Sequence, residues 1–420
     1  MNTMVTGLRH DMSSLVPLVI DPGSETLKAG FAGDEQPLIV CPDLVCKEKE
    51  PDTCKSDRIL DPDKYEFKPI EHAKDFEQAG LPPGLMDAVN SILEAEGHSP
   101  EVPCPLHVIE APVEHGIVVD WEAMVDVLDL CFKERLAVSP SEHPVLMTES
   151  PINTNYLRER LTEIMFENFQ VPAFYLKDTS SLSLLSAGLE TGVVVESGDG
   201  CTYTSVVHEG HVIRQTIPKT FYAGNDVTRY VVEMLKKHKE CNNLNGDIIA
   251  VAKDIKERLC FVSEDFDADL KLAKSIDLYE RKYELSSGKQ ISLNLERLYA
   301  GESLFFPEMF GCNCPGLHKQ ICRTLKMCDP EIRREACTNI LLSGGNTLFP
   351  GMTTRLQMEM NRALPASLGA QVLEIPNQQL FAAWIGGSRF ANSEAMLDRW
   401  IYKADYEEKG AAVVNKKCKS

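Results

Sequence analysis

The sequence lacks several features that mark whole classes of protein. Its first residues carry no basic start followed by a long apolar core, and the apolar stretch at 15–20 is interrupted by Pro17. We therefore expect neither a signal peptide nor a membrane span there. Basic side chains are also scarce: Lys+Arg total 43 against 63 Asp+Glu, which gives a formal net charge of -20. Such a chain repels phosphate backbones, which argues against direct binding of nucleic acid.

The 14 cysteines follow no regular disulfide framework. Scattered thiols in a chain of 420 residues are typical of a reduced intracellular protein. The closest group of metal-ligand types is Cys312, Cys314, His318 and Cys322. This group lacks paired CxxC knuckles, so ordinary buried or surface thiols are favoured over a zinc site.

The composition is that of a globular protein, with 43% hydrophobic and 25% charged residues. These values exclude disorder of the whole chain. At about 150 residues per domain, the length predicts two or three lobes with sizeable cores.

Two hairpins of similar design suggest a duplicated fold. In the first, an apolar run at 16–20 precedes the turn Asp-Pro-Gly-Ser and a second strand at 27–32. In the second, the apolar residues 193–195 precede Glu-Ser-Gly-Asp-Gly and the β-prone residues 202–204. The two turns lie roughly 175 residues apart, so we expect each half of the chain to contribute one turn to a shared cleft.

The rest of the chain predicts an α/β architecture. Helical spacing of apolar residues occurs at 121–136, 157–169, 227–237, 246–260 and 350–363, and short apolar strands at 143–147 and 338–342. Helices that alternate with strands favour layered sheets. Residues 43–107 are dense in Lys, Glu, Asp and Pro, which predicts a variable surface lobe with helix only around 84–96.

The first turn has the chemistry of a phosphate site. Backbone N–H groups around Gly23 and Ser24 could bind phosphate oxygens, Lys28 could neutralise them, and Asp21 could hold a hydrated divalent cation. In the second turn, Glu196 and Asp199 could serve as cation-side acids, and the amides near Gly198 and Gly200 could bind phosphate. Either turn alone is weak support, because glycine turns are common in hairpins. Together with the Leu-Ser-Gly-Gly run at 342–345, they favour a shared phosphate cleft.

Nine longer motifs follow one another along the chain. They are GSETLKAGFAGDEQP, APVEHGIVVDWEAM, EHPVLMTESPIN, LTEIMFENF, SGDGCTYT, DIKERLC, KMCDPEIRREACTNILLSGGNTLFPGM, AAWIGGS and YKADYEEKGAAVVNKKC. In this order they resemble actin across nearly the whole chain. The combination of LSGG, WIGGS and a C-terminal KKC is specific to actins and actin-related proteins, so the related sugar kinases are disfavoured.

The resemblance implies an α/β fold that is duplicated and two-lobed, with four subdomains around a nucleotide cleft. ATP or ADP with Mg²⁺ or Ca²⁺ would occupy that cleft. The expected boundaries are 1–42, 112–186 and 382–420 for subdomain 1, 43–111 for an enlarged subdomain 2, 187–222 and 312–381 for subdomain 3, and 223–311 for subdomain 4.

The motifs also carry actin's nucleotide-binding positions onto this chain. These are Asp21, Gly23, Ser24, Lys28, Ser197, Gly198, Asp199 and Gly200 in the phosphate loops, Gly224, Asp226, Lys253, Lys256 and Glu257 on the adenosine side, and Gly344, Gly345, Thr347 and Phe349 closing the pocket. The resemblance places Asp21, Glu196 and Asp199 around the cation, through water. For Lys253 and Asp226, a purely structural role is an equally open interpretation.

Five departures from actin fall in or near this site. Glu25 replaces a glycine, Glu163 the water-positioning glutamine, Glu196 an aspartate, Tyr203 a histidine and Leu380 the lysine beside adenine. Glu163 and Tyr203 thus occupy the positions that match actin's catalytic, water-positioning residues, and we expect both to be impaired in that role. A carboxylate adds negative charge beside the phosphates, and a phenol cannot replace an imidazole in a water network at neutral pH. We expect nucleotide binding with slow or absent hydrolysis, and an active polymerising ATPase is the alternative.

Two segments that form contact surfaces in actin predict how this chain assembles with other proteins. The long segment 43–107 replaces a short region whose loop inserts into a neighbouring actin subunit, whereas 384–418 matches actin well. This contrast favours a subunit of a protein complex, with actin or other actin-related proteins as partners, over a bulk filament former. No long basic run resembles a nuclear localisation signal, so a cytoplasmic, cytoskeletal protein is the first expectation. The alternative is a nuclear subunit of a chromatin-remodelling complex, which the loop at Glu25 favours.

Overall fold

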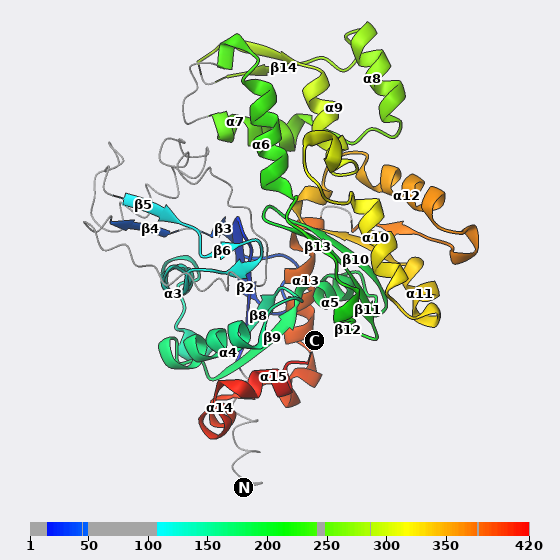
Figure 1. The fold of residues 1–420 in the computed structure, drawn as a ribbon. Coiled ribbons are helices and arrows are strands. Elements are labelled where there is room, and N and C mark those ends of the chain that lie inside the picture. Colours follow the sequence, from blue (N-terminus) through cyan, green and yellow to red (C-terminus); the bar gives the residue numbers. More distant parts are fainter. Residues whose placement is uncertain are drawn as a thin grey trace.

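The computed structural model describes residues 15–43, 45–48, 107–241, 248–285, 287–375 and 378–419. The described chain forms two lobes, each built around its own hydrophobic cluster (Figure 1). Most of the enlarged subdomain 2 predicted at 43–111, including the helix expected at 84–96, lies outside the described residues. The predicted subdomain boundaries therefore stay a prediction.

The first lobe contains a six-stranded sheet in the order β18-β9-β8-β1-β2-β3. Its strands are β1 (Leu18–Pro22), β2 (Thr26–Phe31), β3 (Ile39–Pro42), β8 (Val145–Glu149), β9 (Ala173–Asp178) and β18 (Ile401–Tyr402). Strand β1 pairs antiparallel with β2 and parallel with β8, which in turn pairs parallel with β9. The first predicted hairpin is therefore present at the centre of this sheet.

The second lobe repeats that pattern. Its sheet runs β12-β11-β10-β16-β17, with β13 against β11. The strands are β10 (Gly192–Ser197), β11 (Thr202–His208), β12 (His211–Val212), β13 (Lys219–Thr220), β16 (Ile340–Ser343) and β17 (Val372–Leu373). Strand β10 pairs antiparallel with β11 and parallel with β16, and β16 pairs parallel with β17. Both predicted hairpins therefore occupy the same position in two equivalent sheets, and the predicted α/β duplication is confirmed.

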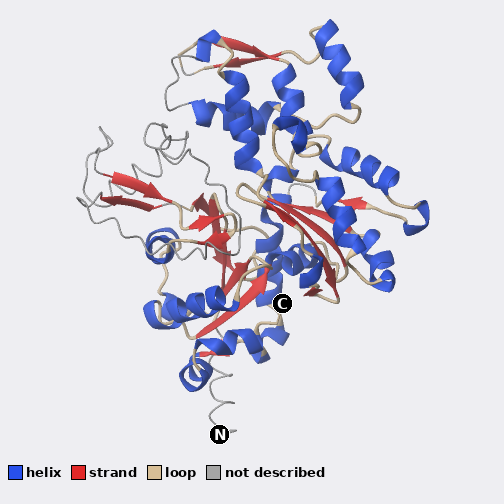
Figure 2. Ribbon diagram, in the orientation of Figure 1, coloured by secondary structure: helices blue, strands red, loops and turns tan. Residues whose placement is uncertain are grey.

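Helices flank both sheets (Figure 2). In the first lobe they are α3 (Trp121–Leu130), α4 (Asn155–Glu163), α5 (Thr179–Ser186), α13 (Ala382–Ala391), α14 (Lys403–Lys409) and α15 (Val414–Lys417). In the second they are α6 (Gly224–Leu235), α7 (Ile248–Leu259), α8 (Phe266–Ser275), α9 (Leu295–Glu302), α10 (Leu317–Lys326), α11 (Pro330–Cys337) and α12 (Met352–Ala363). The five helices expected from periodicity are all present, whereas α5, α8, α9, α10, α11, α13, α14 and α15 were not predicted.

Three two-stranded antiparallel sheets complete the described strands. They are β4 (Val45–Glu48) with β5 (His107–Glu110), β6 (Val113–Glu114) with β7 (Ile117–Val118), and β14 (Arg281–Glu284) with β15 (Gln290–Leu293). Figure 1 shows β14 at the outer end of the second lobe, beyond α6 and α9.

The lobes are joined where α5 crosses α13. A Cβ on Gly386 of α13 would lie 1.8 Å from the carbonyl oxygen of Leu182 in α5, so only glycine permits this approach. The hydroxyls of Ser183 in α5 and Ser343 in β16 lie 3.0 Å apart. Helix α5 therefore packs on the first lobe and also contacts the second, and it leads directly into β10.

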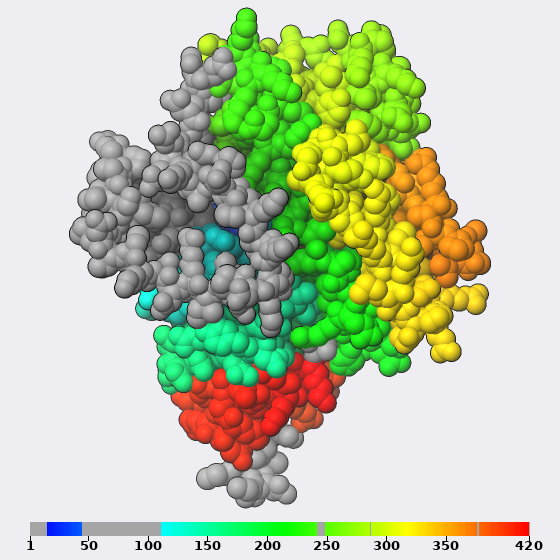
Figure 3. Space-filling model, viewed as in Figure 1, coloured from blue at the N-terminus to red at the C-terminus, as the bar shows by residue number. Residues whose placement is uncertain are grey.

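The C-terminal segment packs under the first lobe, where Figure 3 shows it in red beneath the residues around α4. Arg158 of α4 donates to the side chain of Asn415 at 3.2 Å and to the backbone carbonyl of Cys418. Asn415 donates to Glu159 at 2.6 Å. These contacts anchor the C-terminal tail that the sequence matches well to actin.

The cysteines of the described chain are free thiols, Cys312, Cys314 and Cys322 among them. Within the described residues, no three or more His, Cys, Asp or Glu side chains are arranged to hold a metal ion directly. No helix in the described part of the chain combines the length and the apolar character that a membrane crossing requires.

Candidate functional site

The turns of the two equivalent hairpins meet between the lobes. A Cβ on Gly200 would lie 2.5 Å from the hydroxyl oxygen of Ser24, so the second turn has no room for a side chain there. The same hydroxyl accepts a hydrogen bond from the backbone N–H of Gly116 at 3.0 Å. His115 Nδ1 donates to the carbonyl oxygen of Gly200 at 2.5 Å. Sequence motifs that are far apart along the chain are therefore in direct contact.

Below the first turn lies a buried charge pair. Lys28 Nζ is 3.3 Å from Asp21 Oδ2, and both residues are buried. The hydroxyl of Thr148, at the end of β8, donates to Asp21 Oδ1 at 2.5 Å. Lys28 is thus held with its charge already matched by one carboxylate.

Two of the glycine amides predicted for phosphate are engaged within their own turns. The N–H of Gly23 donates to the carbonyl of Thr26 at 3.1 Å. The N–H of Gly198 donates to the carbonyl of Cys201 at 3.2 Å. These bonds shape the turns, so the N–H groups of Gly23 and Gly198 are already engaged within the chain.

Two further glycines press against the second turn. Gly344, directly after β16, has a φ of 92°, and a Cβ there would lie 2.4 Å from the carbonyl oxygen of Ser197. Gly224, the first residue of α6, donates its N–H to the carbonyl of Gly198 at 2.9 Å. The structure therefore brings the residues predicted at the turn, at α6 and after β16 into one cluster.

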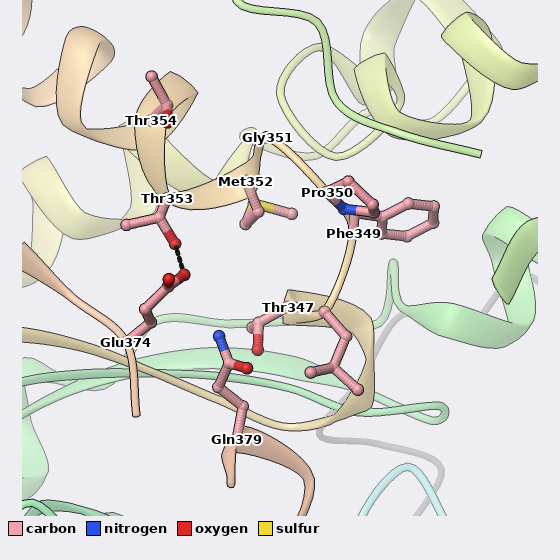
Figure 4. A pocket seen from close by; sticks show the side chains of 10 residues that line it. Thr347, Phe349, Pro350, Gly351, Met352, Thr353, Thr354, Glu374 and Gln379 are labelled. Carbon is pink, nitrogen blue, oxygen red and sulfur yellow. Dashed lines mark hydrogen bonds between the residues drawn. The ribbon is translucent and has the colours of Figure 1, made fainter. Parts of the chain in front are cut away.

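The residues 347–349, which follow Gly344, line one side of a hollow of about 380 Å³ (Figure 4). The hollow is lined by Thr347, Leu348, Phe349, Pro350, Gly351, Met352, Thr353, Thr354, Glu374 and Gln379. Thr347 is buried and donates its hydroxyl to the carbonyl of Gly344 at 2.7 Å. Leu380 Cδ1 lies 3.4 Å from the position of a Cβ added to Gly345.

Charged side chains of both lobes surround Asp199. Burial, and next the negative charge of Glu25, raise the pKa of Asp199 to about 6, against the opposing influence of Lys256 and Lys253. Lys253 Nζ donates to Glu25 Oε1 across the cleft. The predicted residues Asp199, Lys253 and Lys256 thus share one electrostatic environment with Glu25.

The other residues predicted for the adenosine side have local roles. Lys256 is buried and donates to the carbonyl of Gly224 at 3.2 Å. Asp226 accepts a hydrogen bond from the N–H of Ala223 at 2.9 Å and so caps the start of α6. The side chain of Glu257 is 55% exposed. Asp226 therefore has the structural role that the sequence left open, as the cap of α6.

A second cluster lies beside the turn of the second hairpin. Glu196 Oε2 accepts hydrogen bonds from the hydroxyl of Thr179 at 2.7 Å and from the hydroxyl of Tyr203. Glu196 Oε1 is buried without a hydrogen-bond partner. Burial raises the pKa of Glu196 to about 7, although both hydroxyls oppose this shift, and burial raises the pKa of Tyr203 well above its usual range.

Thr179 is a site residue that the sequence did not reveal. It is the first residue of α5 and follows β9 directly. Because the carboxyl ends of parallel strands carry ligand sites in α/β sheets, a strand ending at 178 was the signal that could have pointed to it.

The family model for actin matches residues 12–419. The chain belongs to the actin family. Members of the actin family generally bind a nucleotide with a divalent cation and generally engage other proteins. The turns described above are the parts of this actin-family chain that resemble the phosphate loops.

One predicted catalytic residue does not join the site of this actin-family protein. Glu163 ends α4, its side chain is 38% exposed, and it forms a surface ion pair with Arg160 at 2.9 Å. Its negative charge acts on Tyr406 of α14, near the C-terminus. The assignment of Glu163 to the water-positioning place is therefore corrected, because the residue beside Glu196 and Tyr203 is Thr179.

The carboxylates of the actin-family site fit a hydrated divalent cation. Buried carboxylates are unfavourable unless a cation or hydrogen bonds compensate their charge. Glu196 Oε1 is a buried acceptor without a donor, and Asp199 has a raised pKa, so both would gain from a nearby cation and its waters. Asp21, in contrast, already has its charge compensated by Lys28.

Proposed function

We propose that this actin-family chain is a divergent actin-related protein that binds ATP or ADP as a structural ligand, with slow or absent hydrolysis. Lys28, Lys256 and Asp199 would hold the phosphates and the cation at the meeting point of the two turns. Mg²⁺ or Ca²⁺, when bound, would neutralise phosphate charge and carry ordered water. The nucleotide would then serve to fix the lobes together.

The observation that carries this proposal is the hydrogen-bonded cluster of Glu196, Tyr203 and Thr179. Hydrolysis requires a group that orients the attacking water and accepts its proton. Glu196 Oε2 already accepts two hydroxyls, and the raised pKa of Tyr203 keeps its phenol protonated at neutral pH. Tyr203 is then unsuited to take a proton from water at neutral pH, whereas a histidine at this position could accept one.

The test begins with the nucleotide itself. Purified protein is denatured and its extract is separated by ion-exchange chromatography, and we expect close to one adenine nucleotide per chain. Steady ATP turnover is then measured for the wild type and for Asp199→Ala. No turnover above the Asp199→Ala background supports the proposal, whereas clear turnover that Asp199→Ala abolishes would establish an active ATPase.

Glu163→Gln is the matched control for that assay. It removes a carboxylate from the exposed end of α4, outside the cluster. We expect the nucleotide content and the turnover of this variant to equal those of the wild type. A large change would return Glu163 to the site and contradict its assignment to the surface.

We further propose that the protein acts as a subunit of a protein complex, with actin or other actin-related proteins among its partners, in the cytoplasm and cytoskeleton. The anchored C-terminal segment supports one preserved actin-like face. Affinity purification of the full chain followed by mass spectrometry tests this. Cytoskeletal partners support the proposal, and recovery with chromatin-remodelling subunits would favour the nuclear alternative.

A further inference from the structure

One charged side chain from each lobe meets its counterpart across the cleft. Glu25 lies in the turn between β1 and β2, and Lys253 lies on α7 of the second lobe. Lys253 Nζ donates to Glu25 Oε1, so the contact joins residues 228 positions apart in the sequence. The first hairpin turn is thereby tied to the helical region of the other lobe.

The pair is placed where it can control access to the phosphate site. Glu25 directly follows Ser24, which contacts the second turn at Gly200. Glu25 is also the strongest charge acting on Asp199. The ion pair therefore stands beside the meeting point of the two turns and not at the crossing of α5 and α13, where the chain itself connects the lobes.

The charges around Lys253 favour this pairing. Burial alone would lower the pKa of Lys253, but the neighbouring carboxylates, Glu25 first, raise it above its usual range. Glu257 is 4.0 Å away and Asp199 adds to the negative potential. The ammonium group is thus held charged by carboxylates of both lobes.

The pair is also open to solvent and to salt. The side chains of Lys253 and Glu25 are 31% and 36% exposed. Ion pairs at this exposure are weak and are screened as ionic strength rises. A contact of this kind can open and close, unlike the buried hydroxyl contact between Ser183 and Ser343 at the joint of the lobes.

We propose that Glu25 and Lys253 form a latch that holds the two lobes closed in the absence of nucleotide. This proposal rests on the proposed function in one respect: the site beside the latch is taken to be the nucleotide site. A glycine at position 25 has no side chain and could not form this contact. Glu25 supplies a contact between the lobes that does not depend on a bound ligand. An entering nucleotide then meets a lysine that is already paired.

The test uses the full chain freed of nucleotide and divalent cation with a chelator and a phosphatase. Hydrogen–deuterium exchange of the first turn and of α7 is followed by mass spectrometry for the wild type, Glu25→Gln, Lys253→Met and the double variant. We expect each single variant to exchange about threefold faster in these segments, as for loss of a partly exposed ion pair. The double variant should exchange no faster than the singles, because all three lack the same contact.

Glu308→Gln is the matched control, since Glu308 forms an ion pair of similar exposure with Lys319 within one lobe. It should leave exchange in the first turn and in α7 unchanged. Raising the salt from about 0.05 M to about 0.5 M should speed this exchange in the wild type but not in Glu25→Gln. Small-angle X-ray scattering provides a second measurement, with a larger radius of gyration expected for Glu25→Gln.

The outcomes separate the latch from the proposed function. Unchanged exchange and an unchanged radius in Glu25→Gln, or additive effects in the double variant, would overturn the latch while leaving nucleotide binding intact. If the wild type binds no nucleotide and the variants still open, the proposed function fails and the latch stands.

Discussion

Replacing Glu196 by glutamine should make the nucleotide-free protein more stable at alkaline pH. The pKa of this buried carboxyl is raised from 4.5 to about 7 in the folded state, chiefly by burial. Because the folded-state pKa lies above the unfolded value, the stability that the bound proton contributes is present below about pH 4.5 and is lost as the pH rises through about 7. Glutamine has no such proton to lose.

The size of the effect follows from the shift. At 1.36 kcal/mol per pH unit, a shift from 4.5 to about 7 is worth about 3 kcal/mol. Unfolding entropy of about 2.1 cal/mol/K per residue, over 420 residues, converts this to a melting-temperature difference of roughly 3–4 °C. The advantage of Glu196→Gln over the wild type should therefore widen by most of that amount, about 3 °C, between about pH 5 and about pH 8.

Differential scanning fluorimetry of chelator-treated protein across this pH range measures the difference. Only the gap between variant and wild type is interpreted, because other buried carboxyls, such as Asp43 and Glu149, titrate in both proteins. Glu163→Gln, at an exposed carboxylate, should show a constant gap near zero. A constant gap for Glu196→Gln would refute the argument that burial of an incompletely bonded carboxylate dominates at this position.

Three further predictions follow from the site and the core. Gly200→Ala should weaken ATP binding by about tenfold or more in a calorimetric titration, because its Cβ would lie 2.5 Å from the Ser24 hydroxyl oxygen and force the turns apart; unchanged affinity would contradict the close approach. Arg355→Met should destabilise the second lobe by about 3–5 kcal/mol in urea unfolding, because it leaves the buried carboxylate of Glu302, now at 2.9 Å, without its partner; a loss below about 1 kcal/mol would disprove this. Tyr203→His should raise ATP turnover by about tenfold or more over the wild type, since an imidazole can accept a proton at neutral pH; an unchanged rate would show that the phenol is not what limits hydrolysis.

The fold was largely predictable because hydrophobic periodicity and turn chemistry are local properties. The apolar run before Asp21 and the apolar run before Glu196 both became buried central strands, β1 and β10. Helices α3 and α7 lie where apolar spacing placed them. Helix α5 was missed because it is rich in serine and buried on most sides, so it has no polar face to reveal a helical period.

The site was predictable only in part. Motif matching found the turns that meet at Ser24 and Gly200. It placed Glu163 beside Tyr203, whereas Thr179 is the residue there, because only contact in three dimensions distinguishes the two positions. It found that Glu25 replaces a glycine near the site, without identifying Lys253 as its partner.

By itself, the sequence determined the two hairpins, the α/β class and the family, because each depends on residues that are neighbours along the chain. The tertiary structure alone decided which side chains share an environment. Basic side chains are few in this chain, and in the structure two of those near the site, Lys28 and Lys253, are each already paired with a carboxylate. Electrostatic interactions and hydrogen bonds depend on distance in space, and residues 228 positions apart become partners only in the folded chain.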